Sequence, residues 1–446
     1  LLATMVGLFA ATGGLQQAYG QDGEGATAQS RIDEIIVTAT KRATSLQDTA
    51  LSISAISGER LENLGVGLIS EIIETIPGAI LVDVGPGERK IVFRGLSSNA
   101  TAVGNATTST YIDEFPLSLD TPEVKMVDLE RVEILKGPQG TLYGQSAMGG
   151  VVRYITKKPS TEQVLGGFSA YGSGTADGGS NYGGNGYFNL PISEDLAIRA
   201  ALYNHDNAGF IDNLGTNTKD VNTEKTSGGR AALKWNVSDK TTLDVLYFYQ
   251  ELTAIGGQLA GTQSIGSTFT PTSSGATNLI PPSLSNPAYF NNVDGVKDNA
   301  DEALNVKLEM NFDEFSLTLM GANKQRKRVV QSDGSPFFNI NDGSTQIFVD
   351  FYSEVDADTF EARLVSDSDG FFEWIAGIWY EKEEGFSTTQ WEMRDSLVAS
   401  LPSGLLLQDS GQLRNREENA IYGEVGFNFT EKAKLTLGYR RSDVEG

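Results

Sequence analysis

From about residue 163 to its end, the chain alternates apolar and polar residues one by one. In residues 304–312, the apolar Leu304, Val306, Leu308, Met310 and Phe312 alternate with the polar Asn305, Lys307, Glu309 and Asn311. A period of two is typical of β-strands with one apolar and one polar face, because successive side chains point to opposite sides. The pattern therefore predicts an antiparallel sheet for most of the chain.

Eleven segments qualify as strands of this sheet. They are residues 164–171, 183–190, 195–204, 226–237, 242–251, 303–312, 315–330, 347–365, 371–384, 418–429 and 434–441. Short polar turns near 191–194, 238–241, 313–314, 366–370 and 430–433 alternate with longer connections at roughly 204–225, 251–302, 331–346 and 385–416. Short turns at one rim and long loops at the other are typical of outer-membrane barrels, whereas a soluble sandwich, the alternative, does not need them. Since bacterial single-chain barrels have even strand numbers, residues 163–446 are expected to form a partial transmembrane β-barrel, about half of one.

Composition excludes several classes of function. The chain has 34 Lys and Arg against 58 Asp and Glu, a formal charge of −24, so no nucleic-acid partner is expected. It has no Cys and one His, which excludes thiol catalysis and thiolate metal sites. We therefore predict no catalytic residues, no metal site and no cofactor.

The N-terminal residues have the pattern of an export signal. Residues 1–10 are mainly apolar and small residues follow, so 1–20 are expected to be a signal peptide that is truncated at its start. A buried N-terminal helix is the alternative. Residues 21–42 are expected to be a flexible leader.

Residues 43–160 lack the strict alternation, and their pattern predicts a small mixed α/β domain. Ser57 is placed to cap a helix that ends at Gly65, and a second helix is expected over Leu68–Ile76 before Pro77. Short strands are expected at Ile80–Val84, Ile91–Arg94, Tyr111–Asp113, Arg131–Lys136 and Val151–Thr156.

Five segments within this domain resemble a known family. The longest is DLERVEILKGPQGTLYG at residues 128–144, followed by GGVV at 149–152 and TKKP at 156–159; FRGL at 93–96 and YIDEFPL at 111–117 precede it in the expected order. Together they strongly resemble the plug of TonB-dependent outer-membrane receptors. The resemblance covers about residues 33–160, including the leader, and implies a plug domain held inside the barrel.

The same resemblance assigns a partner to the leader. The segment Asp33, Glu34, Ile35, Ile36, Val37, Thr38 and Ala39 looks like the TonB box, which the periplasmic TonB protein grips. A β-prone segment on a flexible leader is suited to this, because it can add as a strand to an exposed sheet edge. An ordinary edge strand of the small domain is the alternative.

Two further sets of residues take expected roles from the family. Arg94 and Arg131 lie in the matching motifs and are expected to pair with barrel glutamates as a latch, unless they are solvated in a wet lumen. Ligand contacts are expected from an apex loop that includes Ser97, Ser98, Asn99, Asn105 and Thr110.

The resemblance implies a receptor in the bacterial outer membrane that takes up a scarce ligand with energy from TonB. A ferric siderophore is the commonest cargo, with cobalamin, haem or saccharides as alternatives, and a passive porin as a rival. Outer-membrane lipid would surround the strands. His205 and Asp206 lack an accompanying nucleophile motif, so the chain is not expected to be an enzyme.

Overall fold

The structure is a computed structural model. It describes residues 36–42, 44–47, 49, 51–82, 89–96, 107–118, 123–144, 147–256, 288–289, 293–335, 345–366, 370–396, 404–430 and 433–446, which all belong to the compact unit Ile35–Gly446. The predicted signal peptide lies outside these residues. None of the helices in the described part of the chain is long and apolar enough to cross a membrane.

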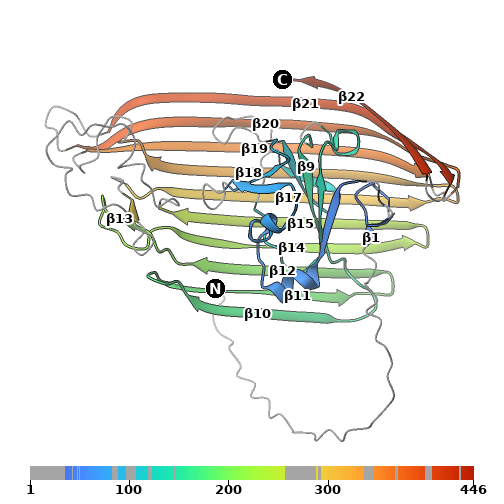
Figure 1. The fold of residues 1–446 in the computed structure, drawn as a ribbon, viewed down its shortest axis with the longest axis horizontal. Helices are drawn as coiled ribbons and strands as arrows, with labels where there is room; N and C mark the ends of the chain where they lie inside the picture. Colours follow the sequence, from blue (N-terminus) through green and yellow to red (C-terminus); the bar gives the residue numbers. More distant parts are fainter. Residues whose placement is uncertain are drawn as a thin grey trace, which may run out of the picture. The chain divides into compact units, whose positions relative to one another are not determined.

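One antiparallel sheet of eleven strands, called here the large sheet, contains most of the described residues (Figure 1). Its strands, in spatial order, are β10 (Leu165–Gly174), β11 (Ser180–Pro191), β12 (Leu196–Asn207), β14 (Thr223–Ser238), β15 (Thr241–Ile255), β17 (Val296–Asn311), β18 (Phe315–Asp333), β19 (Thr345–Ser366), β20 (Phe372–Ser396), β21 (Leu405–Thr430) and β22 (Ala433–Glu445). Two short strands, β13 (Asp212–Asn213) and β16 (Ala288–Tyr289), pair in the connections. The eleven predicted strands are confirmed, each in its predicted place.

The alternation in sequence becomes a difference between the two faces of the large sheet. On β12, Ile198 and Leu202 are 37% and 67% exposed, whereas Arg199 and Ala201 between them are 6% and 2% exposed. The exposed face is therefore apolar, and polar side chains turn toward the small domain. This is the arrangement that a strand needs when lipid lies on one side of it.

The predicted connection 385–416 is wrong over most of its length, because β20 continues to Ser396 and β21 begins at Leu405. The two strands stay paired out to Met393 opposite Leu405. Polar residues occupy both faces here, as in residues 387–390, so the hydrophobic alternation disappears while the main-chain pairing continues.

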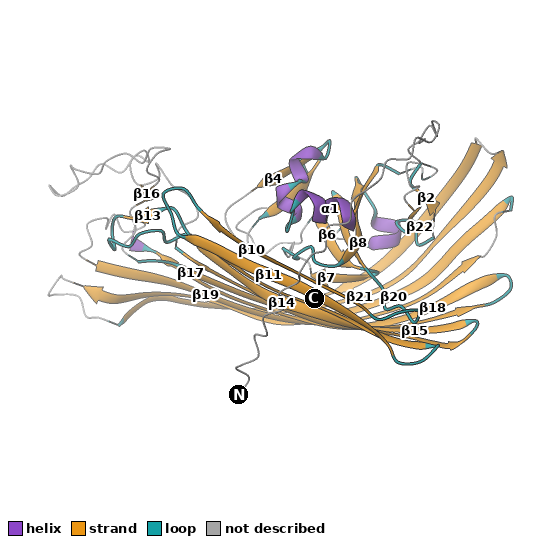
Figure 2. Ribbon diagram, turned by 90° about the horizontal axis from the view of Figure 1, so that it is seen from below, coloured by secondary structure: helices purple, strands orange, loops and turns teal. Residues whose placement is uncertain are grey.

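The small domain packs on one face of the large sheet (Figure 2). Its strands are β1 (Ile36–Val37), β2 (Thr44–Ser45), β3 (Ile53–Ser57), β4 (Ala79–Val82), β5 (Lys90–Phe93), β6 (Thr108–Ile112), β7 (Phe115–Ser118), β8 (Leu129–Lys136) and β9 (Gly150–Thr156). Five of them form a sheet in the order β3-β8-β9-β6-β7, while β1 pairs with β2 and β4 with β5. The helices are α1 (Gly58–Leu64) and α2 (Gly140–Tyr143).

The first predicted helix is confirmed together with its caps. The Ser57 side chain accepts a hydrogen bond from the Arg60 amide, and Gly65 ends α1 in the left-handed conformation that glycine adopts most readily. The second predicted helix is instead two 3₁₀ turns, Ile69–Glu71 and Ile73–Thr75. The β-branched residues of this segment lower its propensity to form an α-helix. The two 3₁₀ turns, which are tighter than an α-helix, bury the side chains of Ile69 and Ile73.

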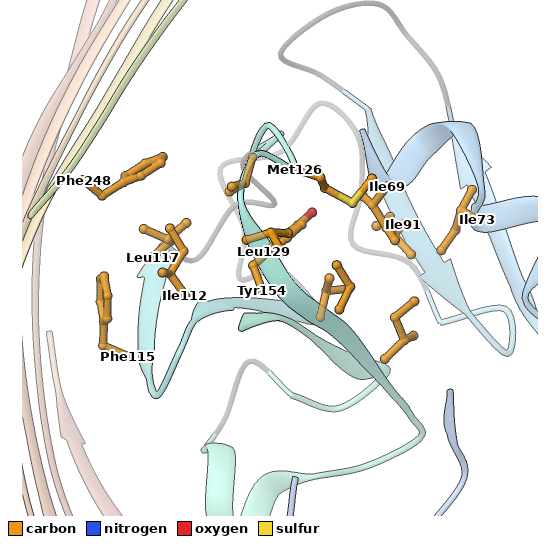
Figure 3. Close-up of a cluster of buried hydrophobic side chains, with 14 of the residues drawn as sticks. Ile69, Ile73, Ile91, Ile112, Phe115, Leu117, Met126, Leu129, Tyr154 and Phe248 are labelled. Atoms are coloured by element: carbon orange, nitrogen blue, oxygen red, sulfur yellow. The ribbon is translucent and has the colours of Figure 1, made fainter. Parts of the chain in front are cut away.

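A shared apolar cluster joins the small domain to the large sheet. Ile112, Phe115 and Leu117 of the small domain belong to one buried cluster with Phe248 of β15 (Figure 3). Met320 of β18 is part of the same cluster. The small domain is therefore held on the sheet by packing as well as by the charges described below.

Gly150 at the start of β9 leaves no room for a side chain. A Cβ there would overlap the Leu135 carbonyl oxygen and the Phe93 ring. We expect Gly150→Ala to destabilise the small domain by about 1–3 kcal/mol, the usual cost of overpacking, in denaturant unfolding. The control is Gly140→Ala in α2, where a Cβ meets nothing within 4 Å and stability should hold or rise. Equal effects of the two changes would contradict this explanation.

Candidate functional site

The segment Ile36–Ala39, called here the coupling segment, lies docked on the small domain. Val37 and Ala39 are fully buried. The Thr38 amide donates to Glu133 Oε1 at 3.0 Å, and the Tyr143 hydroxyl donates to the Ala39 carbonyl at 2.7 Å. β1 pairs only with β2 and not with the five-stranded sheet, so the coupling segment is not an edge strand of that sheet. Asp33, Glu34 and Ile35 lie outside the described residues.

Glu133 organises the dock from the centre of β8. Its side chain is fully buried, accepts a hydrogen bond from Arg131 Nε at 2.8 Å and pairs with Arg153 of β9. Arg153 also donates to the Thr38 hydroxyl at 3.1 Å. The two arginines together compensate the charge of the buried Glu133 carboxylate. Arg153 has a further N–H group, which donates to the coupling segment.

The two cations that follow the coupling segment reach the large sheet. Arg42 donates to the Ser366 carbonyl at 2.5 Å, the Ser366 hydroxyl at 2.9 Å and the Trp374 carbonyl at 2.7 Å, where β19 ends and β20 begins. The Lys41 ammonium is buried 3.9 Å from both Glu361 of β19 and Glu114. Burial lowers the pKa of Lys41 to about 8, although Glu361 opposes the shift.

Of the two arginines of the predicted latch, Arg131 has partners other than those expected. Arg131 is buried and pairs with Glu130 and Glu133 of its own strand, so neither a barrel partner nor a solvated side chain is observed for it. Arg94 is exposed and has a φ of 52°, and its guanidinium covers Gly137 in the Gly137-Pro138 turn. The described contacts of Arg131 therefore lie within the small domain, whereas a barrel partner for the exposed Arg94 stays a prediction.

A tie centred on Asp128 has the opposite polarity, with the carboxylate on the small domain. Asp128, buried and at a φ of 53°, accepts hydrogen bonds from Arg199 of β12 at 2.8 Å and 2.5 Å. Arg230 of β14 donates to the same carboxylate at 2.9 Å and to the Val127 carbonyl at 2.6 Å. Planar guanidinium groups suit this bidentate arrangement.

A second tie is centred on Glu114, in the turn between β6 and β7. It pairs with Arg363 of β19, and Lys307 of β17 lies 3.5 Å away. Burial alone would raise the pKa of Glu114, but these cations hold that pKa well below its usual range. Other ties have the expected polarity, since Lys125 and Arg89 lie 3.4 Å and 3.6 Å from Glu224 of β14.

A cavity of about 310 Å³ separates the dock from the large sheet. Ile36 and Thr38 of the coupling segment line it, opposite residues of β14, β15 and β17. Charges of both signs face it, including Glu114, Arg153 and Lys307. The coupling segment therefore borders a cavity between the dock and the large sheet.

The predicted apex loop is mostly untested. Ser97, Ser98, Asn99 and Asn105 lie outside the described residues. Thr110 is not a loop residue, because it lies in β6 with 1% exposure. All five residues of β6 are buried, which the Ser and Thr composition of the segment did not indicate.

His205 and Asp206 face different partners, as expected for neighbours on a strand. His205 Nδ1 lies 3.2 Å from the Tyr171 hydroxyl, and Asp206 pairs with Lys225 at 3.0 Å. The described residues contain no group of three His, Asp or Glu side chains that could hold a metal ion.

A family model, the TonB-dependent Receptor Plug Domain, matches residues 45–151. Those residues are a TonB-dependent receptor plug. The match includes β8, which carries Glu133, and the Asp128 tie that precedes it. The coupling segment lies just upstream of the plug, which is the position that the resemblance in sequence assigns to the TonB box.

Known proteins resemble the chain beyond its plug. It is 29% identical over 220 residues to the pesticin receptor of Yersinia pestis, covering 48% of this chain and 31% of the relative. The vitamin B12 transporter BtuB of Photobacterium profundum is 26% identical over 199 residues, covering 41% of this chain and 32% of the relative. The crystal structure of the ferric yersiniabactin uptake receptor FyuA from Yersinia pestis matches with a TM-score of 0.69 at 17% identity, covering 89% of this chain and 60% of that chain. These matches span only part of each relative, and the structural match establishes the fold.

Proposed function

We propose that the chain is part of a bacterial outer-membrane receptor that takes up a ferric siderophore with energy delivered by TonB. The observation that carries the proposal is a plug tied to one face of an antiparallel sheet whose other face is apolar. An apolar outer face suits lipid, and a plug across the inner face blocks passage until work is done on it. A passive porin has no use for such a plug.

The leader supplies the connection to TonB in this proposal. Residues 1–20 direct export, residues 21–42 form the leader, and Asp33–Ala39 is the segment that TonB grips. Val37 and Ala39 are buried in the dock, so they become available for strand addition only after the segment leaves it. The outer membrane holds no nucleotide supply of its own, which is why a partner has to provide the energy.

The proposed cargo follows from the relatives whose names state a ligand. FyuA is a ferric yersiniabactin uptake receptor, and BtuB makes cobalamin the second candidate. The iron is cargo here, not a resident cofactor. Uptake makes and breaks no covalent bond, so no catalytic residue is assigned and the chain is not proposed to be an enzyme.

Growth of a strain that carries the gene, compared with its deletion, tests the proposal under iron limitation with a panel of ferric siderophores. We expect one siderophore to restore growth and to deliver ⁵⁵Fe only when TonB is present. Uptake that persists without TonB would overturn the receptor mechanism in favour of a porin. A cobalamin auxotroph grown on limiting cobalamin is the second arm, and growth there alone would replace the siderophore by cobalamin.

A further inference from the structure

We propose that Lys41 and Arg42 form a clamp between the coupling segment and the large sheet, which has to open before a pull on that segment moves the plug. The proposal rests on the proposed function, since it concerns how force from TonB enters the molecule. The clamp lies between residues 36–39, which would be gripped, and β3 at Ile53, the first strand of the five-stranded plug sheet. Along the main chain, a pull therefore reaches the clamp before it reaches β3, although Thr38 and Ala39 also contact Glu133 and Tyr143 of the plug upstream of the clamp.

The acceptors of the three Arg42 hydrogen bonds described above belong to the large sheet, called here the wall. Two of these three hydrogen bonds go to main-chain carbonyls, those of Ser366 and Trp374. These residues lie where β19 and β20 meet, and both strands are paired along nearly their whole length. Because the main chain of a long paired hairpin moves little under force, a pull on Arg42 is transmitted to the wall.

Lys41 is attached in a way that favours release. Its ammonium lies 3.9 Å from each carboxylate, beyond the 2.7–3.2 Å of a good hydrogen bond. Its main chain has a φ of 60°, a conformation that costs a non-glycine residue energy. Burial lowers its pKa to about 8, so the charged side chain gains hydration when it leaves.

Both carboxylates that lie near Lys41 keep other cationic partners when Lys41 leaves. Glu361 remains paired with Arg363 at 3.0 Å and accepts a hydrogen bond from Tyr422. Glu114 remains paired with Arg363 and Lys307. Opening the clamp therefore strands no buried carboxylate, which is the usual large cost of breaking a buried ion pair. The Asp128 tie lacks this property, because two arginines would be left facing each other.

Hydrogen exchange on the full chain in detergent tests the clamp without ligand or TonB. We expect Arg42→Ala to speed amide exchange in residues 36–42 by about tenfold or more, because charge-assisted bonds that hold the segment are lost. Exchange in β8 should not change. The matched control is Arg60→Ala, which removes an exposed arginine of α1. Unchanged exchange in residues 36–42, or equal acceleration in β8, would overturn the proposal.

Pulling on single molecules separates the clamp from the plug. Because the chain has no Cys, Ser30→Cys in the leader and Asp239→Cys in an exposed turn of the wall provide two unique handles. We expect an early rupture followed by plug unfolding, and we expect Arg42→Ala to remove only the early event. A single event in the parent chain, or an early event that survives the substitution, would refute the clamp. If no siderophore restores growth in the growth test, the proposed function is refuted. The hydrogen-exchange and pulling results would still hold.

Discussion

Ile36→Pro is expected to abolish energised uptake while binding of the ferric siderophore stays nearly unchanged. Proline removes a main-chain donor, and a segment that adds as a strand to its partner needs its donors. Ile36 is 44% exposed at the start of the dock, so the change removes little packing from the plug. Uptake of ⁵⁵Fe-loaded siderophore and equilibrium binding to whole cells measure the two quantities separately.

Two controls distinguish loss of coupling from loss of structure in that experiment. Ile36→Val keeps the β-prone character and the donor, so uptake should persist. Gln29→Pro places the same residue in the leader, upstream of the coupling segment, and should also leave uptake intact. Normal uptake by the Ile36→Pro variant would move the TonB contact to another part of the chain.

Asp128→Asn is expected to destabilise the seating of the plug by about 3–5 kcal/mol, because it leaves the buried Arg199 and Arg230 without their counter-charge. Hydrogen exchange of β8 and β9 as a function of denaturant measures the loss. The Asp128 side chain is fully buried and those of the arginines are 6% and 9% exposed, so solvent does little to screen the change.

A surface pair in the same plug provides the comparison for Asp128. Glu62 and Lys157 lie 3.4 Å apart with 54% and 36% of their side chains exposed, so Glu62→Gln should cost less than about 1 kcal/mol. Replacing the whole buried group, as Asp128→Leu with Arg199→Met and Arg230→Met, should recover most of the stability. If Asp128→Asn costs no more than Glu62→Gln, the tie does not seat the plug.

The strands of the large sheet were predictable because one physical cause acts along them. Lipid on one face and a polar interior on the other impose a period of two, as Ile198 and Arg199 show. The strands were not predicted where the period of two is absent. Residues 385–396 and 405–416 are paired strands with polar residues on both faces. Main-chain pairing leaves no mark on the side-chain pattern there.

The ties were harder to predict because they join residues that are distant in sequence. The motif around Arg131 indicated a charged contact, but the sequence does not show that Glu133, two residues away, takes up this charge. Arg199 and Arg230 each face inward from neighbouring strands, and two inward cations require a carboxylate nearby. Which carboxylate fulfils this need depends on the packing of the plug, and Asp128 immediately precedes the recognised β8 motif.

The order of strands has a consequence for how the chain folds. In the large sheet each strand pairs with the strand that follows it, apart from the two short strands in the connections, so growth can proceed hairpin by hairpin with low contact order. In the plug, Ile53 must meet Leu135, and Thr108 must meet Gly150 in a parallel pair. Each of these closures carries a loop-entropy cost before any contact compensates for it. We therefore expect the slow search during biogenesis to lie in the smaller domain.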